Sequence, residues 1–345
     1  MDTLLEDALG ELFGHVTSGA SPGRQITENQ RIEIADEIDA SGFADLLLPQ
    51  AAGGSGSSLY EALALLKMEG YHNVPIPFAQ TVVIRAWAHA HSVDLPDGMF
   101  SYASAALQVD AQTRSATLHK AWHGHSVDHM LIATDQQCFL AHSQDRRILQ
   151  AYHGGLFAAV AWPAQSLTRL NLHEQAAQDL FNLSVFAMLA VTVGAMEKAL
   201  ELTLDYAAQR QQFGRPVSKF QAVQHQISEM AEHVCAADMA LQMAAANNDN
   251  DNALTVPNCQ QLAIAQFQIA HIADSIADMA HAIHGAIGIS QEYPLHQYTR
   301  RIRECKSCFG SAQYWATAIG QHILHKNNDT LFAVLTSTRD EQRTG

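Results

Sequence analysis

The segment Tyr206–Pro216, YAAQRQQFGRP, contains the residues whose chemistry is easiest to state. Arg210 offers five donors in a fixed fork that suits a diphosphate, and Phe213 can lie beside a flat ring. The structural alternative makes Arg210 a solvated cation, favoured at a helix end by the helix dipole, and places Phe213 in the core. The residue types alone leave both interpretations open.

A second candidate segment, Gly285–Arg301, reads GAIGISQEYPLHQYTRR. Gly285 lacks a Cβ, so the backbone there can approach a phosphate closely. Glu292 lies within this segment and Glu304 follows shortly after it. A carboxylate acts as a general base only where it lies within reach of the proton that it removes from the substrate. Glu304 is more simply an ion-pair partner, because it stands in a basic cluster made of Arg300, Arg301, Arg303 and Lys306.

Two groups among the 19 histidines have spacings that suit a metal ion. The first group is close in sequence, and its side chains share one strand face only if no bulge interrupts the alternation: His119, His123, His125 and His129. The second group follows a helical spacing: His271, Asp274, Asp278 and His281. A metal-binding helical bundle is therefore an alternative of a different class, but surface histidines are ordinary and we predict no metal ligand. Cys305 and Cys308 cannot complete a four-ligand site and are interpreted as reduced core cysteines.

The composition excludes several classes of partner. The 345 residues carry a net charge of -15, from 20 Lys+Arg against 35 Asp+Glu, whereas a nucleic-acid partner needs a basic face. The start, MDTLLEDALGELFG, lacks a basic and an apolar signal region. The longest nearly uncharged run, Phe181–Met196, is shorter than the roughly 20 residues of a membrane span. Five cysteines form no disulfide framework, so we expect a cytoplasmic protein without a membrane partner.

Three regions are expected to position these residues. Residues 1–97 have helical apolar spacing, with Thr27 as an N-cap, Gln30 three residues later and a helix end near Gly42. Residues 98–177 contain short alternating runs (SYASAALQV, SATLHKAWH, HMLIAT and QCFLAHS) that predict a small antiparallel sheet. Residues 178–345 predict a four-helix bundle from helices over 181–210, 218–246, 259–285 and 294–328, the last broken near Gly310.

In this order of regions, and in its motifs, the sequence resembles the acyl-CoA dehydrogenase family. The family pattern Tyr-Ala-x-x-Arg-x-x-Phe-Gly is matched over 206–214, and the segment Gly285–Arg301 is similar to the family's Gly-Gly-x-Gly-Tyr segment with its acidic residue, Tyr-Pro and Arg. LLLPQAAGGSG (46–56) resembles a Pro-Glu-x-x-Gly-Gly-x-Gly loop, and 118–134 a strand pair around Gly-x-Lys-x-Trp. The resemblance implies an α+β fold with an N-terminal helical domain, a shortened middle β domain and a C-terminal four-helix bundle.

The resemblance also implies FAD as the cofactor, shared between two chains. In the family the bundle motifs hold the adenosine diphosphate half of the flavin bound by the neighbouring chain. The residues carried over are Arg210, Gln212, Phe213, Gln221, Ala282, Gly285 and Ala286. Ala282 and Ala286 replace the family's glutamine and second glycine, which weakens the match there.

The family's catalytic machinery has no counterpart in this sequence. Its base is a glutamate at one of two places, which Phe309 and Ser184 occupy here. Phenylalanine accepts no proton, and serine without an adjacent base is a poor acceptor. The neighbouring arginine of the CoA side is Val185, and Gly124 stands where a hydroxyl residue contacts the flavin, although Trp122 is kept. The family's Thr-Glu-Pro and Gly-Ser-Asp motifs are also absent from residues 100–118. We therefore predict no catalytic residue in this chain.

The resemblance therefore implies the non-catalytic subunit of a heterotetrameric acyl-CoA dehydrogenase of the steroid side-chain degradation type. The partner would be a catalytic subunit that binds most of the acyl-CoA, a bulky steroid or bile-acid derivative. An electron-transfer flavoprotein would accept the electrons. A self-sufficient FAD-dependent dehydrogenase, with Glu292 or Glu304 as a relocated base, is the alternative.

Overall fold

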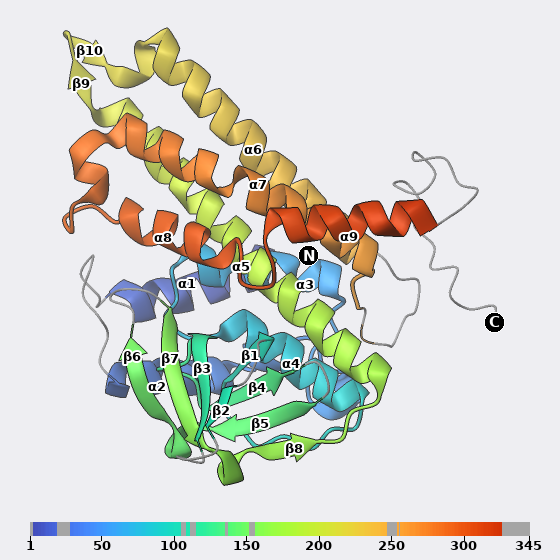
Figure 1. Cartoon of the computed structure of the whole chain (residues 1–345). Helices are drawn as coiled ribbons and strands as arrows, with labels where there is room; N and C mark the ends of the chain where they lie inside the picture. The colour runs from blue at the N-terminus through green and yellow to red at the C-terminus, as the bar shows by residue number, and fades with distance from the viewer. Residues whose placement is uncertain are drawn as a thin grey trace.

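Helical, β and again helical regions follow one another along the chain, as the family resemblance predicts (Figure 1). The computed structural model describes residues 3–18, 28–104, 108–110, 115–134, 137–151, 156–246, 254 and 256–325. In Figure 1 the β region and α4 (Phe78–Ala90) lie at the bottom, α1 (Thr3–Ser18) and α3 (Leu59–Tyr71) lie in the middle, and the C-terminal region extends toward the upper left, except for α9 (Ala312–His325), which runs to the right.

The described residues of the N-terminal region form the helices α1 (Thr3–Ser18), α2 (Glu28–Ser41), α3 (Leu59–Tyr71) and α4 (Phe78–Ala90). The predicted end of α2 is confirmed, because Gly42 follows it with a φ of 76°; Thr27 lies outside the described residues. α3 begins with a capping box in which the Ser58 hydroxyl accepts from the Glu61 amide and the Glu61 carboxylate accepts from the Ser58 amide. Two short 3-10 helices, Phe43–Asp45 and Gln50–Ala52, connect α2 to α3.

In the part of the β region that the structure describes there are two four-stranded sheets, whereas the sequence predicted one. The first, in the order β1-β4-β5-β8, is formed by Phe100–Ser104, His129–Ala133, Cys138–His142 and Thr168–Leu170; the second, β2-β3-β7-β6, by Gln108–Asp110, Ser115–Trp122, Phe157–Pro163 and Arg147–Ala151. The antiparallel prediction is wrong for β1 and β4, which pair in parallel because β2 and β3 between them belong to the other sheet. Leu118, Val160 and Trp162 belong to a small apolar core of their own in this region.

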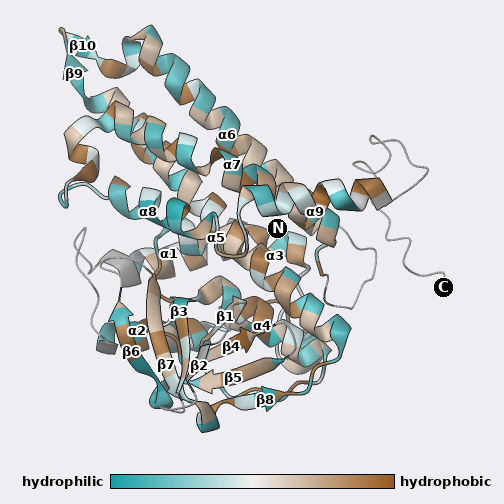
Figure 2. Ribbon diagram, in the orientation of Figure 1, coloured by the Kyte–Doolittle hydropathy of each residue, from teal (hydrophilic) through white to brown (hydrophobic). Residues whose placement is uncertain are grey.

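The C-terminal region contains α5 (Glu174–Gln209), α6 (Gln221–Ala245), α7 (Cys259–His284), α8 (Leu295–Cys305) and α9 (Ala312–His325). The predicted break near Gly310 is confirmed, since this glycine has a φ of 117° between α8 and α9. α8 is mostly hydrophilic in Figure 2, and its Arg303 pairs with Asp278 of α7. α5 is long and apolar enough to span a membrane, yet 94% of its most apolar window is buried inside the protein, as in a core helix.

Two glycines allow α3 and α5 to cross in close contact. A Cβ on Gly70 would lie 1.8 Å from the Val191 carbonyl oxygen, and a Cβ on Gly194 would lie 1.9 Å from the Lys67 carbonyl oxygen. Next to this crossing, Lys67 Nζ lies 2.6 Å from Glu197 Oε1 on α5 and 2.8 Å from Asp238 Oδ1 on α6. The N-terminal region and the bundle are therefore joined through direct backbone contact.

A buried polar junction joins all three regions. Arg301 of α8 donates to the carbonyl oxygens of Glu69 (2.7 Å) and Val74 (2.8 Å). The Glu69 carboxylate accepts from the Ala79 amide at 2.8 Å and lies 3.7 Å from Nε2 of His123, which follows β3. Burial raises the pKa of Glu69 to about 7, although Arg301 opposes the shift. Burial and then Arg301 hold the pKa of His123 well below 6.5.

Glu69 should make the stability of the protein depend on pH. Its pKa in the folded protein lies above the ordinary value of 4.5, so its contribution is fully present below that value and is lost as the pH rises through about 7. We expect the variant Glu69→Gln to remove a decrease of up to about 3 kcal/mol in the free energy of unfolding across that window. Urea unfolding at several pH values measures it.

The difference between wild type and Glu69→Gln isolates Glu69 from His123, whose lowered pKa produces the opposite slope below about 6.5. The exposed carboxylate Glu292 provides a control, because Glu292→Gln should keep the wild-type slope. Equal slopes in wild type and Glu69→Gln would contradict the assignment.

Candidate functional site

The predicted binding segment Tyr206–Pro216 ends α5 and forms a small β-hairpin. Strands β9 (Gln211–Gln212) and β10 (Arg215–Pro216) are joined by Phe213 and Gly214, whose φ angles of 49° and 78° give a two-residue turn of the I′ kind. Phe213 is 93% exposed, so the prediction that it could be a core residue is wrong. A phenylalanine that is both exposed and in the left-handed region is unusual.

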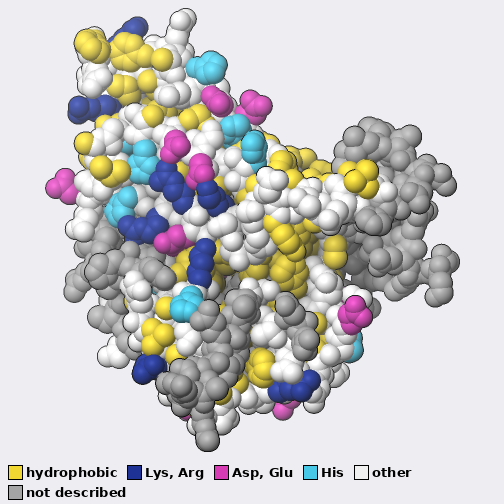
Figure 3. Space-filling view, in the orientation of Figure 1, with side chains coloured by type: hydrophobic (Ala, Val, Ile, Leu, Met, Phe, Trp, Pro, Cys, Tyr) yellow, Lys and Arg dark blue, Asp and Glu magenta, His cyan; other side chains and the backbone are white. Residues whose placement is uncertain are grey.

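Hydrophobic side chains gather at the tip of the bundle, at the upper left of Figure 3, where Figure 1 places β9 and β10. Arg210 is exposed beside them, and its backbone is fixed because its amide donates to the Tyr206 carbonyl and its carbonyl accepts from the Val217 amide. The Arg215 guanidinium instead lies over the Phe220 ring, 4.3 Å from the centroid. Arg210 makes no ion pair with the described residues, so its fork is available to an external anion.

Gln212 and Gln221 are also exposed at this end, in β9 and at the first residue of α6. The second predicted segment follows α7. Gly285, with a φ of 64°, ends α7 and begins a 3-10 helix, η6 (Gly285–Ile289), and nothing lies within 4 Å of the position of a Cβ on it. Ala282 and Ala286 are exposed on either side of it. All seven predicted binding residues therefore lie on the surface.

An aromatic cluster brings the two segments to the same end of the bundle. The Tyr206 ring of α5 stacks on the His284 ring of α7, with centroids 4.4 Å apart. Tyr293 packs 5.0 Å from His284, and its hydroxyl donates to the Leu202 carbonyl at 3.1 Å. The sequence analysis did not single out His284 as a residue of this cluster. Its position directly before Gly285 and the match at Tyr206 were the signals that could have indicated it.

The two positions that the resemblance gives to a catalytic base lie elsewhere, in the interior. Ser184 of α5 is fully buried, and its Oγ has no hydrogen-bond partner among the described residues. Phe309 is buried after α8, where its ring stacks on Tyr102 of β1 at 5.9 Å and meets Phe181 of α5 edge-on at 6.0 Å.

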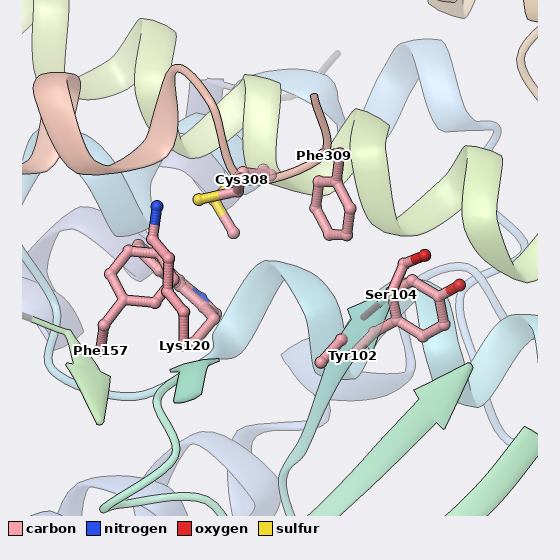
Figure 4. A pocket seen from close by; sticks show the side chains of 9 residues that line it. Tyr102, Ser104, Lys120, Phe157, Cys308 and Phe309 are labelled. Carbon is pink, nitrogen blue, oxygen red and sulfur yellow. The ribbon is translucent and has the colours of Figure 1, made fainter. Parts of the chain in front are cut away.

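A small cavity separates the β region from the bundle at Phe309. Its volume is about 20 Å³, which is room for about one water molecule. The lining residues are Tyr102, Ala103, Ser104, Lys120, Trp122, Phe157, Met188, Cys308 and Phe309. Figure 4 shows Lys120 and Phe157 on one side, Tyr102 and Ser104 on the other, and Cys308 with Phe309 above them.

Neither remaining carboxylate lines this cavity. Glu292 is exposed in the turn before α8. Glu304 is partly buried, and its carboxylate accepts from the Leu156 amide at 3.4 Å. Burial raises the pKa of Glu304, opposed by that hydrogen bond and by Arg300, Arg301 and Lys120.

The histidine groups do not form a metal site in the part of the chain that the structure describes. A bulge between Leu118 and Ala121 breaks the alternation needed to align His119 with His123. In the helical group, Asp274 pairs with Lys306 and Asp278 with Arg303. His271 stacks on Phe267, and His281 Nε2 lies 2.8 Å from the Thr299 hydroxyl.

Known proteins match both this sequence and this fold. Residues 175–324 match the model of the acyl-CoA dehydrogenase C-terminal domain. Acyl-CoA dehydrogenase FadE27 of Mycobacterium tuberculosis is 24% identical over 325 residues, covering 83% of this chain and 86% of that protein.

Two solved complexes contain chains of the same fold. One chain of the ChsE4-ChsE5 complex from Mycobacterium tuberculosis has a TM-score of 0.74 at 20% identity, covering 95% of this chain and 99% of that chain. One chain of the Tcur3481-Tcur3483 steroid ACAD has a TM-score of 0.73 at 20% identity, covering 93% and 98%. The C-terminal region therefore matches an acyl-CoA dehydrogenase C-terminal domain, and the described chain has the acyl-CoA dehydrogenase fold.

Proposed function

We propose that this chain is the non-catalytic subunit of a heterotetrameric acyl-CoA dehydrogenase and completes the FAD site of a catalytic partner. The observation that carries the proposal is a contrast between two places in one chain. Arg210 and Phe213 are displayed at the tip of the bundle, while Phe309 and Ser184 occupy the positions of the family's base in the interior.

The exposed end fits the dinucleotide half of FAD. Arg210 would bind the diphosphate through its fork of donors, Phe213 would lie against a flat ring, and the open space at Gly285 would admit a phosphate. Gln212, Gln221, Ala282 and Ala286 complete the surface that the cofactor would contact. When bound, FAD supplies the acceptor for the hydride of the substrate; the residues of this chain would bind and orient its far end.

The interior does not fit the other half of FAD. A three-ring flavin cannot enter a cavity of about 20 Å³ between Tyr102, Trp122 and Phe309. Neither Ser184 nor Phe309 has a side chain that could take a proton from the acyl-CoA. Both observations support a chain that has no flavin or base of its own and lends its surface to another subunit.

The substrate and partners are proposed from the relatives. Each of the two solved complexes is named after two proteins, and one is called a steroid ACAD. This favours a bulky steroid or bile-acid side-chain acyl-CoA as the substrate, which the partner would mainly bind. An electron-transfer flavoprotein would take the electrons from the complex, which we place in the cytoplasm. The partner would be an acyl-CoA dehydrogenase chain with an intact catalytic glutamate.

Co-expression with such a partner tests the proposal. We expect this chain alone to be colourless and inactive, and the copurified complex to be yellow with one FAD per pair of unlike chains. Absorbance of the flavin against protein mass measures the ratio. A yellow, active protein obtained from this chain alone would contradict the proposal.

Phe213 offers a second test, because one substitution separates its ring from its turn. Asparagine adopts the left-handed region readily, and Asn-Gly is a preferred I′ turn. The variant Phe213→Asn should therefore keep the hairpin and leave Tm unchanged or slightly raised, while FAD in the complex binds about ten-fold more weakly. Flavin release on dilution, read with a thermal melt, distinguishes the two effects; unchanged FAD affinity would contradict the assigned contact.

A self-sufficient dehydrogenase with a relocated base is the second candidate, favoured only by the raised pKa of Glu304. Its carboxylate accepts from the Leu156 amide and does not line the cavity, so a proton on a substrate there would be out of its reach. Under this alternative Glu304→Gln would abolish turnover in a complex that keeps its FAD. Under our proposal turnover is retained.

A further inference from the structure

We infer that Tyr102 and Phe309 form an aromatic plug that closes this chain's own ring-binding site, while the platform of that site is preserved beneath it. The inference rests on the proposed function and deepens it, because it names what closes the site. The two rings stack with an interplanar angle of 27° and come from different regions, β1 and the segment between α8 and α9. They meet where the β region faces the bundle.

The plug is anchored rather than loosely placed. The Phe309 carbonyl accepts from Trp315 Nε1 at 3.0 Å, and Gly310 makes the turn that follows it. On the other side, the Tyr102 amide donates to Gln80 Oε1 at 2.8 Å, within the buried strand β1. Both rings are buried. Each is held in the closed position because the backbone of its own residue is fixed by these hydrogen bonds.

The walls beneath the plug have the chemistry of a site for a flat ring. Trp122 and Phe157 pack edge to face with centroids 5.1 Å apart, and Lys120 Nζ lies 4.7 Å from the centroid of Phe157. Ser104 adds a hydroxyl on the opposite wall, as Figure 4 shows. Aromatic walls with a cation and a hydroxyl beside them favour a planar heterocycle that presents hydrogen-bond acceptors on one edge. The flavin ring is of this class.

Removal of the plug should therefore create binding of a flavin ring that has no nucleotide tail. The probe is lumiflavin, titrated into the full-length chain, with quenching of its fluorescence as the readout. Wild type should not quench it, and the double variant Tyr102→Ala/Phe309→Ala should bind it at least roughly ten-fold more tightly than wild type. Adding Lys120→Met should remove most of this gain, which a nonspecific hole in the core would not show.

Phe181→Ala is the matched control, because Phe181 touches Phe309 but does not line the cavity; we expect no gain of binding. A thermal melt identifies folded variants, and Phe309→Leu replaces the double variant if that one unfolds, with a smaller gain expected. A folded variant that binds no more lumiflavin than wild type overturns the plug. That result leaves the flavin ratio of the copurified complex intact, so the failure of the plug and the failure of the proposed function are separable.

Discussion

Replacing Arg210 by alanine should loosen FAD in the assembled complex by about 10- to 100-fold. Hydrogen bonds between a guanidinium and an anion contribute about 1.5–3 kcal/mol. The Arg210 backbone is fixed by Tyr206 and Val217, and its side chain is exposed. The loss should therefore appear as weaker binding of the cofactor rather than as unfolding. Equilibrium dialysis of FAD against the apo-complex measures it.

Arg215→Ala is the matched control for this prediction. It removes the same charge from the same hairpin, but the Arg215 guanidinium lies over Phe220 and outside the family pattern. We expect FAD affinity to change by less than about three-fold, since only a general surface potential is altered. Equal losses in both variants would mean that the hairpin attracts FAD by net charge alone, which would refute a specific role of Arg210.

Gly194→Ala should produce a large loss of stability for a single added methyl group. The new Cβ would lie 1.9 Å from the Lys67 carbonyl oxygen and 3.0 Å from the Tyr71 amide. Backbone atoms cannot rotate away, so α3 and α5 must separate. We expect a cost of about 3 kcal/mol or more, which outweighs the gain of about 1 kcal/mol that alanine brings to a helix interior. The midpoint of thermal unfolding and the soluble yield report it.

The control for this prediction is Gly320→Ala in α9, where no atom lies within 4 Å of the added Cβ. There only the helix propensity changes, so we expect a gain of up to about 1 kcal/mol. If Gly194→Ala is as stable as Gly320→Ala, the close crossing of α3 and α5 is not what joins the two regions.

Long periodic elements and local signals could be predicted from the sequence. The break at Gly310 and the helix end at Gly42 followed from glycine, which adopts a positive φ at no steric cost. The acyl-CoA dehydrogenase C-terminal domain and the fold were predicted from the motifs at 206–214 and 285–301, because these motifs have distinctive residue types at fixed spacings.

Contacts between distant segments could not be predicted, because no local pattern encodes them. The parallel pairing of β1 with β4 depends on which sheet receives β2 and β3. The stack of Tyr102 on Phe309 joins residues about 200 positions apart, so the sequence could not predict which ring packs against Phe309. Phe213 was ambiguous because its exposure depends on the turn that follows α5.

The hairpin at the tip of the bundle also bears on how the subunits assemble. Its strands have two residues each, and a two-stranded ribbon of this length is only marginally stable in water. Its amide hydrogens should therefore exchange quickly in the isolated chain and slowly in the complex. Under the proposed function, part of the binding energy would be spent on ordering the hairpin, which would lower affinity and make cofactor occupancy a condition for firm assembly. A partner that has lost its FAD would thus hold this subunit less tightly, so the cofactor would report on the completeness of the complex.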